Sequence, residues 1–337
     1  MLSTSDRAMV DDVLGPCGAR QRRAIAKTIT LLESTHADHR ARTDEVLSAL
    51  LPKSGRSFRL GVSGVPGVGK STFIESLGLQ LIEQGHRVAV LAVDPSSTVS
   101  GGSILGDKTR MERLSADDRA FIRPSPSSGT LGGVAEKTRE SMLVVEAAGY
   151  DTVIVETVGV GQSEIAVAGM TDMFVLLQLP NAGDDLQAIK KGVTEMADLV
   201  VINKSDLDEA AATRARAQVT SSLRLLGLHG RPEGAPDGGA AWHPQVLQLS
   251  ALTGQGMDGF RAEATRFREM QTANGQLMSR RQRQTEAWMK ERIEAGLRQR
   301  FRAHPAVRAA WPGVVDDVRA GRLAASVAAR RLLDLMD

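Results

Sequence analysis

The chain has 337 residues, and its 42 Lys and Arg residues against 40 Asp and Glu residues give a formal net charge of +2. Such an even balance of charges argues against a protein that binds nucleic acid by electrostatic attraction. The basic surface of such a protein normally shows in its total charge. A single cysteine, Cys17, excludes an internal disulfide, and no apolar run approaches the length of a membrane-spanning helix. The amino-terminal segment also lacks the apolar stretch of a secretory leader. We therefore expect a cytoplasmic protein without nucleic-acid or membrane partners.

Three regions follow one another along the chain. Residues 1–55 carry apolar residues at helical spacing and predict an amino-terminal helical extension. Residues 56–272 alternate short apolar runs with longer amphipathic stretches, and residues 273–337 are again helical in pattern. We expect one central domain with a helical extension at each end.

Seven short runs in the central region predict β-strands, and most of them are nearly continuous Val, Ile and Leu. Strands buried on both faces of a parallel sheet have this composition. Because helical stretches alternate with them, we predict an α/β fold with a doubly wound, mostly parallel sheet. The predicted strands are Arg59–Ser63, Arg87–Val93, Ala120–Arg123, Asp151–Glu156, Met173–Leu179, Leu199–Asn203 and Val246–Leu249. The predicted helices lie near 71–84, 133–148, 185–196, 208–226 and 256–270.

A phosphate-binding loop follows the first predicted strand and begins the next helix, as in the P-loop NTPases. Its glycines let backbone N–H groups wrap closely around phosphates at a helix amino terminus. Lys70 is expected to reach the β- and γ-phosphates, and the Ser71 hydroxyl to bind Mg²⁺. The residues expected at the phosphates are Gly64, Val65, Pro66, Gly67, Val68, Gly69, Lys70, Ser71 and Thr72.

The segment Asn203-Lys204-Ser205-Asp206 follows a buried strand and resembles the base-recognition motif of the GTPase superfamily. A carboxylate such as that of Asp206 accepts hydrogen bonds from the N1–H and 2-amino groups of guanine. Adenine would leave buried polar groups unpaired, at about 1–3 kcal/mol for each group. Asn203 is expected to hydrogen-bond around the base edge and the stem of Lys204 to cover the ring. The sequence thus favours GTP and GDP over adenine nucleotides.

A second base loop is expected after the last strand of the sheet. There the sequence reads Ser250-Ala251-Leu252, which matches the second base loop of the same superfamily. In that loop a backbone amide meets the guanine oxygen.

Acidic residues near the ends of two strands are candidates for Mg²⁺ binding. Glu156 begins the run Glu156–Gly159, where most GTPases have Asp-x-x-Gly, and the Gly159 amide is expected to face the γ-phosphate. Asp94 follows the second strand, although it is also a plausible turn former before Pro95. Asp107 lies in a Gly- and Ser-rich segment, 98–111, that we predict to be a switch loop. We expect Lys70, Asp107, Glu156 and Gly159 to serve hydrolysis, and Ser71, Asp94, Asp107 and Glu156 to bind the metal.

The roles of two further polar residues, Arg110 and Gln162, stay open. Arg110 either stabilises transition-state charge or forms a surface salt bridge. Gln162 lies three residues after Gly159, whereas the water-orienting glutamine of Ras-like enzymes follows that glycine directly. We therefore assign it no such role and expect slow hydrolysis that a partner stimulates.

The phosphate loop, Asp94-Pro-Ser-Ser, Gly101–Met111, Glu156–Glu164 and Asn203–Asp206 together resemble the MeaB/ArgK family. This resemblance implies a GTPase chaperone that binds adenosylcobalamin-dependent methylmalonyl-CoA mutase, gates cofactor delivery and protects the mutase. It further implies a mobile stretch near 178–191 that couples nucleotide state to the mutase. Members of this family have also been named kinases of transport proteins. The sequence shows no separate site for a protein substrate that would support this name.

The same resemblance implies a homodimer formed through the carboxy-terminal helical arm. The arm has an apolar stripe with a spacing of four residues, which is typical of a helix face that packs on another surface. The stripe consists of Met289, Ile293, Leu297 and Phe301.

Two alternatives stay open at this point. A nickel-insertion GTPase needs a Cys- and His-rich site, but the chain has one Cys and six His, with only His36 and His39 close together in sequence. A nucleotide-bound scaffold would keep the phosphate loop without turning GTP over. The joint presence of Lys70, Ser71 and the acidic candidates favours hydrolysis.

Overall fold

The computed structural model describes residues 2–34, 36–93, 111–125, 131–157, 163–181, 191–225 and 242–336. Contacts within the chain divide it into two units, Met1–Met278 and Ser279–Asp337. The first unit contains two large hydrophobic core clusters, and the second contains a small one.

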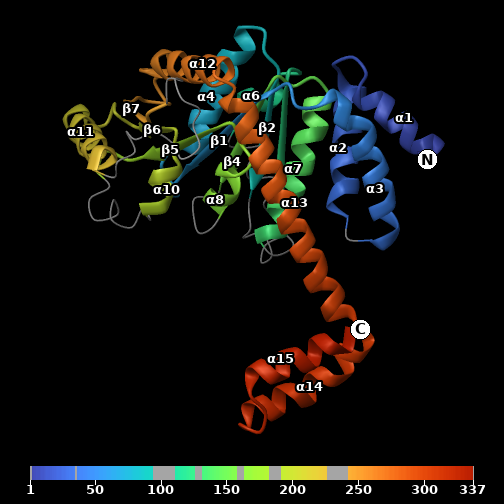
Figure 1. The fold of residues 1–337 in the computed structure, drawn as a ribbon. Coiled ribbons are helices and arrows are strands. Elements are labelled where there is room, and N and C mark those ends of the chain that lie inside the picture. Colours follow the sequence, from blue (N-terminus) through green and yellow to red (C-terminus); the bar gives the residue numbers. More distant parts are fainter. Residues whose placement is uncertain are drawn as a thin grey trace. The chain divides into compact units, whose positions relative to one another are not determined.

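A seven-stranded sheet lies at the centre of the first unit, in the order β3-β2-β4-β1-β5-β6-β7 (Figure 1). All of its described strand pairings are parallel. The predicted doubly wound α/β class and all seven predicted strands are therefore confirmed. The strands are β1 (Phe58–Gly64), β2 (Val88–Val93), β3 (Ala120–Ser125), β4 (Thr152–Thr157), β5 (Met173–Gln178), β6 (Leu199–Ile202) and β7 (Gln245–Gln248).

Helices cover both faces of the sheet, as its two buried apolar faces require. One face packs against a core that contains Phe73, Phe260 and Phe267, and its helices are α4 (Lys70–Glu83), α6 (Glu112–Ala116) and α12 (Met257–Ala273). The other face carries α7 (Leu131–Ala147), α8 (Ser163–Ala168), α10 (Lys191–Met196) and α11 (Glu209–Leu225). The short helices α6 and α8 were not predicted from the sequence.

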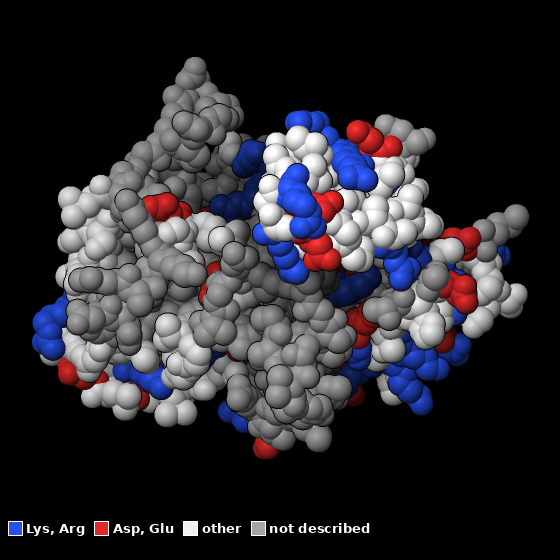
Figure 2. Space-filling view, turned by 90° about the horizontal axis from the view of Figure 1, so that it is seen from below, with Lys and Arg blue, Asp and Glu red and all other residues white. Residues whose placement is uncertain are grey.

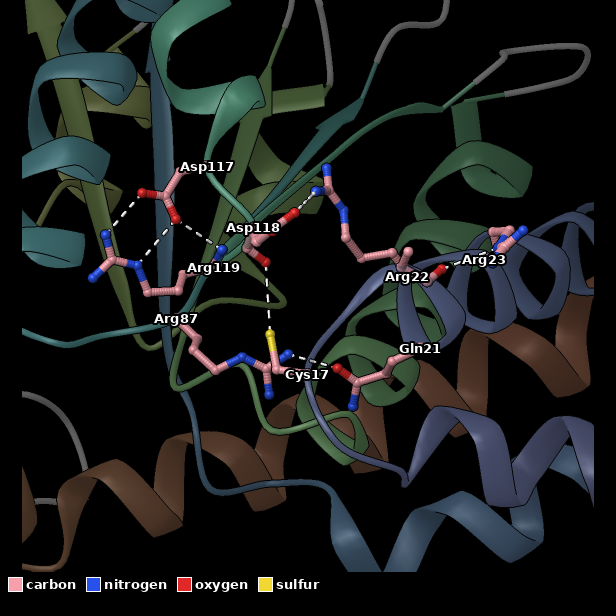
Figure 3. Close-up of polar contacts among 9 residues, drawn as sticks. Cys17, Gln21, Arg22, Arg23, Arg87, Asp117, Asp118 and Arg119 are labelled. Atoms are coloured by element: carbon pink, nitrogen blue, oxygen red, sulfur yellow. Dashed lines mark hydrogen bonds and ion pairs between the residues drawn. The ribbon is translucent and has the colours of Figure 1, made fainter.

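The amino-terminal extension forms α1 (Thr4–Val13), α2 (Ala19–Glu33), α3 (Ala37–Leu50) and the short η1 (Leu51–Lys53), and α2 and α3 pack beside α7 (Figure 1). Figure 3 shows polar contacts that fasten α2 to the sheet region. The side-chain oxygen of buried Gln21 accepts a hydrogen bond from Arg87 at 2.7 Å, and its nitrogen donates to the Ala148 carbonyl at 2.9 Å. Arg22 pairs with Asp118 at 2.9 Å. The extension is thus part of the first unit.

The second unit is helical and has few buried side chains. It contains most of α13 (Gln276–Ala303), then α14 (Pro305–Arg319), α15 (Ala325–Leu333) and the short η2 (Asp334–Met336). Its buried apolar cluster consists of Val314, Ala328 and Leu332.

Charged side chains of both signs lie on the described part of one face of the molecule. Figure 2 shows Lys and Arg beside Asp and Glu on the face in view, in keeping with the near-equal totals in the sequence. Within the described ranges, no helix has the length and apolar character needed to cross a bilayer.

Candidate nucleotide-binding site

The predicted nucleotide residues gather at one edge of the sheet. Because the strands are parallel, their carboxyl ends lie on the same side, where open α/β sheets bind ligands. β1 ends at Gly64, β4 ends at Thr157, and β6 and β7 lead into Asn203 and Ser250.

The phosphate loop needs glycine at two positions for reasons of both conformation and space. Gly64 and Gly69 have φ angles of 148° and 96°. A Cβ on Gly64 would lie 2.5 Å from the Leu177 carbonyl oxygen, and one on Gly69 would lie 2.7 Å from Nδ2 of Asn203. The loop therefore passes too close to β5 and to the base-recognition segment for a side chain to fit.

Lys70 begins α4, and its buried ammonium group folds back over the loop. Nζ donates to the carbonyl oxygens of Gly64 at 2.7 Å and Val65 at 3.2 Å. The positive charge thus lies against the loop at the amino terminus of a 14-residue helix. Both the charge and the helix dipole favour an anion at this place.

An oxygen-rich pair lies between the phosphate loop and β4. The Ser71 hydroxyl donates to Oε1 of Glu156 at 3.3 Å, so the two predicted metal-binding residues are neighbours. One residue beyond Glu156 on β4, the hydroxyl of Thr157 is buried and hydrogen-bonded at 2.8 Å to the buried hydroxyl of Ser63 on β1. This second pair joins β1, which precedes the phosphate loop, to β4, which contains Glu156.

Asn203 connects three loops of the site. Its Nδ2 donates to the Val68 carbonyl at 2.8 Å, and its Oδ1 accepts from the Ala251 amide at 3.0 Å. Its own backbone N–H donates to the Gln178 carbonyl at 2.9 Å. The side chain therefore ties the phosphate loop to the second base loop, a role additional to the predicted contact with the base edge.

The remaining base-recognition residues surround this connection. Lys204 has a φ of 59° and is the one described non-glycine residue with a positive φ. The predicted base-binding residue Asp206 is exposed. Buried Ser250 supports its loop by accepting a hydrogen bond at its side chain from the Thr253 amide at 3.2 Å, and Leu252 projects into solvent.

Some predicted residues lie outside the described part of the chain. These are Asp94, Asp107, Arg110, Gly159 and Gln162, together with most of the stretch near 178–191. Thr72 is described and exposed on the first turn of α4. The sequence did not indicate the contacts of the Val68 and Gln178 carbonyls, because backbone acceptors leave no residue-type signal.

The histidine pair of the amino-terminal extension lies in α3 and the turn before it. His39 shares a hydrogen bond of 2.7 Å with the Ser34 hydroxyl, and the His36 and His39 ring centroids are 5.5 Å apart. Among the residues that the structure describes, no group of three or more His, Cys, Asp and Glu side chains could hold a metal ion.

Comparison with known proteins places this geometry in a family. The sequence matches the family described as methylmalonyl-CoA mutase-associated GTPase MeaB over residues 25–306. It is 50% identical to the GTPase ArgK of Escherichia coli over 275 residues, which cover 81% of this chain and 80% of that one. It is also 46% identical to the mitochondrial methylmalonic aciduria type A homolog of Mus musculus over 343 residues, covering 98% of this chain and 80% of the relative.

A solved structure supports the same placement. The crystal structure of a LAO/AO transport system kinase matches with a TM-score of 0.76 and 36% identity, and it covers 100% of this chain and 99% of that one. The matched fold, the phosphate loop and the base-recognition segment agree with the family match. The chain therefore belongs to the MeaB family of GTPases.

Proposed function

We propose that this protein binds and hydrolyses GTP as a chaperone of adenosylcobalamin-dependent methylmalonyl-CoA mutase, gating cofactor delivery and protecting the mutase. One observation carries the proposal: Asn203 joins the phosphate loop to the predicted guanine-recognition loops. The family description names mutase association, and the name of the mouse relative refers to methylmalonic aciduria. The single cysteine, which cannot form an internal disulfide, supports a cytoplasmic location.

The site residues fit a magnesium ion. Mg²⁺ prefers oxygen ligands and is commonly held by one or two protein groups together with nucleotide phosphates. The Ser71 hydroxyl and the Glu156 carboxylate lie 3.3 Å apart and form such a donor set. When bound, Mg²⁺ would neutralise phosphate charge. Lys70 would hold the β- and γ-phosphates, and the loop amides would orient them.

Phosphate release tests the proposal directly. Purified protein is incubated with GTP and Mg²⁺, with and without adenosylcobalamin-dependent methylmalonyl-CoA mutase, and a Lys70→Ala variant serves as the background. We expect slow release by the protein alone and faster release with the mutase. Release no faster than that of Lys70→Ala under both conditions would favour a nucleotide-bound scaffold. A rate that the mutase leaves unchanged would contradict the chaperone role.

We also propose a homodimer formed through the second unit. Met289, Ile293 and Leu297 of α13 are each more than half exposed, as is Leu333 of α15. A unit of 59 residues (279–337) with a buried apolar cluster of three side chains leaves much apolar surface facing water. A second copy of the same surface would cover it, because twofold dimers pair identical patches.

A further inference from the structure

Two buried hydroxyl groups connect strands β1 and β4 at the edge of the sheet where the predicted nucleotide-binding residues gather. The backbone register of these two strands ends with Val62 opposite Glu156. The next residues are Ser63 on β1 and Thr157 on β4, and their hydroxyls are hydrogen-bonded at 2.8 Å. The two residues are 0% and 1% exposed. Their side chains therefore extend the connection between the strands by one residue toward the site.

The hydroxyl pair departs from the composition of the strands around it. Strands that are covered on both faces are mostly apolar, and β4 has the buried apolar run Val153, Ile154 and Val155 before this point. Two buried hydroxyls must bond to each other to offset their lost hydration, whereas alanine and valine would fill the same places without that requirement. Departures from the local pattern concentrate at functional sites. The pair is thus better explained by the neighbouring site than by core packing.

Each hydroxyl-bearing residue is one peptide bond away from a residue that contacts the first turn of α4. Ser63 precedes Gly64, whose carbonyl oxygen accepts a hydrogen bond at 2.7 Å from the ammonium group that begins α4. Thr157 follows Glu156, whose Oε1 accepts a hydrogen bond at 3.3 Å from the Ser71 hydroxyl. The described contacts therefore form a closed path, because the hydroxyls join β1 to β4 and both strands are joined to the same turn of α4.

The hydroxyl pair and the Glu156 carboxylate lie on opposite faces of the sheet. Successive side chains of a strand alternate between the two faces. Glu156 faces α4, where it contacts Ser71, so Thr157 faces the side on which α8 packs against β1 and β4. The pair thus holds the backbone of Glu156 from behind and takes no space on the face where this carboxylate acts.

We infer that Ser63 and Thr157 are positioning residues for GTP hydrolysis. Their hydrogen bond fixes the end of β4, and with it Glu156, relative to the phosphate loop that begins at Gly64. A carboxylate that is to bind Mg²⁺ beside the phosphates needs fixed geometry, because a displacement of about 1 Å can lower a rate about 100-fold. This inference rests on the proposed GTPase function and adds two residues to the predicted site.

The test removes the hydroxyls singly and together from the full chain. Thr157→Val and Ser63→Ala each remove one hydroxyl, a double variant removes both, and Thr157→Ser keeps the hydroxyl. The control, Thr152→Val, removes a hydroxyl from the opposite end of β4, where it donates to Asp151 at 3.1 Å. For each protein we measure kcat for GTP, the Mg²⁺ concentration that gives half of the maximal rate, GDP affinity without Mg²⁺, and thermal unfolding.

The expected changes correspond to the loss of one hydrogen bond. In Thr157→Val and in Ser63→Ala, kcat should fall about fivefold and the required Mg²⁺ concentration should rise about threefold. The double variant should be no slower than either single variant, because all three lose the same interaction. Thr157→Ser should keep most of kcat, and Thr152→Val should match the parent. GDP affinity without Mg²⁺ should stay within about twofold in every variant, since the phosphate and base loops are unchanged.

Each other outcome contradicts a separate point. If Thr157→Val and Ser63→Ala unfold at a lower temperature but keep the kcat and Mg²⁺ requirement of Thr152→Val, the pair is only structural and the inference is wrong. If the losses of the two single variants multiply in the double variant, the hydroxyls do not act through their hydrogen bond, and the inference is again wrong. Should Thr157→Val fail to fold, an unchanged kcat in Ser63→Ala overturns the inference. A parent protein without GTP hydrolysis would overturn the proposed function instead.

Discussion

Asn203 joins the phosphate loop to the predicted second base loop. Its two carboxamide atoms bind backbone atoms of Val68 and Ala251, which are 135 and 48 residues away in sequence. The amide is buried, so each lost hydrogen bond would leave an unsatisfied group at a cost of about 1–3 kcal/mol. This connection explains why Gly69 cannot carry a side chain, because the added Cβ would meet Nδ2 of Asn203.

Two glycines of the loop provide a matched test of that connection. Gly67 and Gly69 both have positive φ angles, of 79° and 96°, but a Cβ on Gly67 would meet nothing within 4 Å. We expect Gly67→Ala to lower the free energy of unfolding by about 1–2 kcal/mol through backbone strain alone. Gly69→Ala should lower it further by roughly 1–3 kcal/mol by displacing a buried hydrogen bond. Urea unfolding of nucleotide-free protein measures both. Equal losses would contradict the role given to Asn203.

At the scale of elements, a buried ion pair joins helix α7 to strand β1 of the sheet. Glu146 of α7 accepts hydrogen bonds from the Gly55 amide at 2.7 Å, from Nε of Arg59 at 2.6 Å and from the Ser57 hydroxyl. Burial opposes the negative charge, but the bonds from Arg59, Ser57 and Gly55 outweigh it, so the pKa of Glu146 lies below its ordinary value of 4.5.

Glu146→Gln should destabilise the first unit strongly, because it leaves Arg59 partly buried without its ion partner. We expect a loss of about 3–5 kcal/mol in the free energy of unfolding near neutral pH. Since the pKa is lower in the folded state, this stabilisation exists above pH 4.5 and is lost as the pH falls below it. The difference between parent and variant should therefore shrink in acid. Unfolding curves from pH 7 to pH 3 measure it, with Glu269→Gln, on the exposed side of α12, as the control. A difference that does not change with pH would contradict the assigned ion pair.

The sequence predicted helices and strands well where burial requires a continuous or periodic pattern of apolar residues. β2 and β6 consist of Val, Ala, Leu and Ile without a polar residue, as expected for strands that are covered on both faces. The helices α6 and α8 have five and six residues, so neither contains two turns of a 3.6-residue period. The position of α6 depends on tertiary contacts such as the hydrogen bonds that Oε1 of Glu75 in α4 accepts from the Arg113 and Leu114 amides.

The sequence was enough to predict which residues form the candidate site, but not which contacts those residues make. The spacing of Gly64–Ser71 and Asn203–Asp206 requires only local chain geometry, and the structure brings both segments to one sheet edge. The bonds of Asn203 join partners far apart in sequence through backbone atoms. A single sequence contains no pattern that would indicate them.

For the whole molecule, the proposed dimer makes a prediction about the second unit. Ile293→Glu places a charge in the exposed apolar stripe of α13 and should give monomers in light scattering, because a buried charge without a partner is costly. Ala295→Glu adds the same charge about 200° around the helix from position 293 and should leave the dimer intact. A dimer that survives Ile293→Glu at micromolar concentration would place the contact elsewhere.

We propose that guanine recognition, hydrolysis and the response to the mutase depend on one site, and a change of nucleotide tests this most directly. Asp206→Asn removes the acceptor for the 2-amino group of guanine, and xanthine carries an oxygen there that an Asn amide can bind. Phosphate release from GTP and from xanthosine triphosphate is measured with the mutase present, for parent and variant. We predict that the mutase stimulates the parent with GTP and the variant with xanthosine triphosphate. A variant that still prefers GTP, or whose activity with xanthosine triphosphate ignores the mutase, would contradict the account.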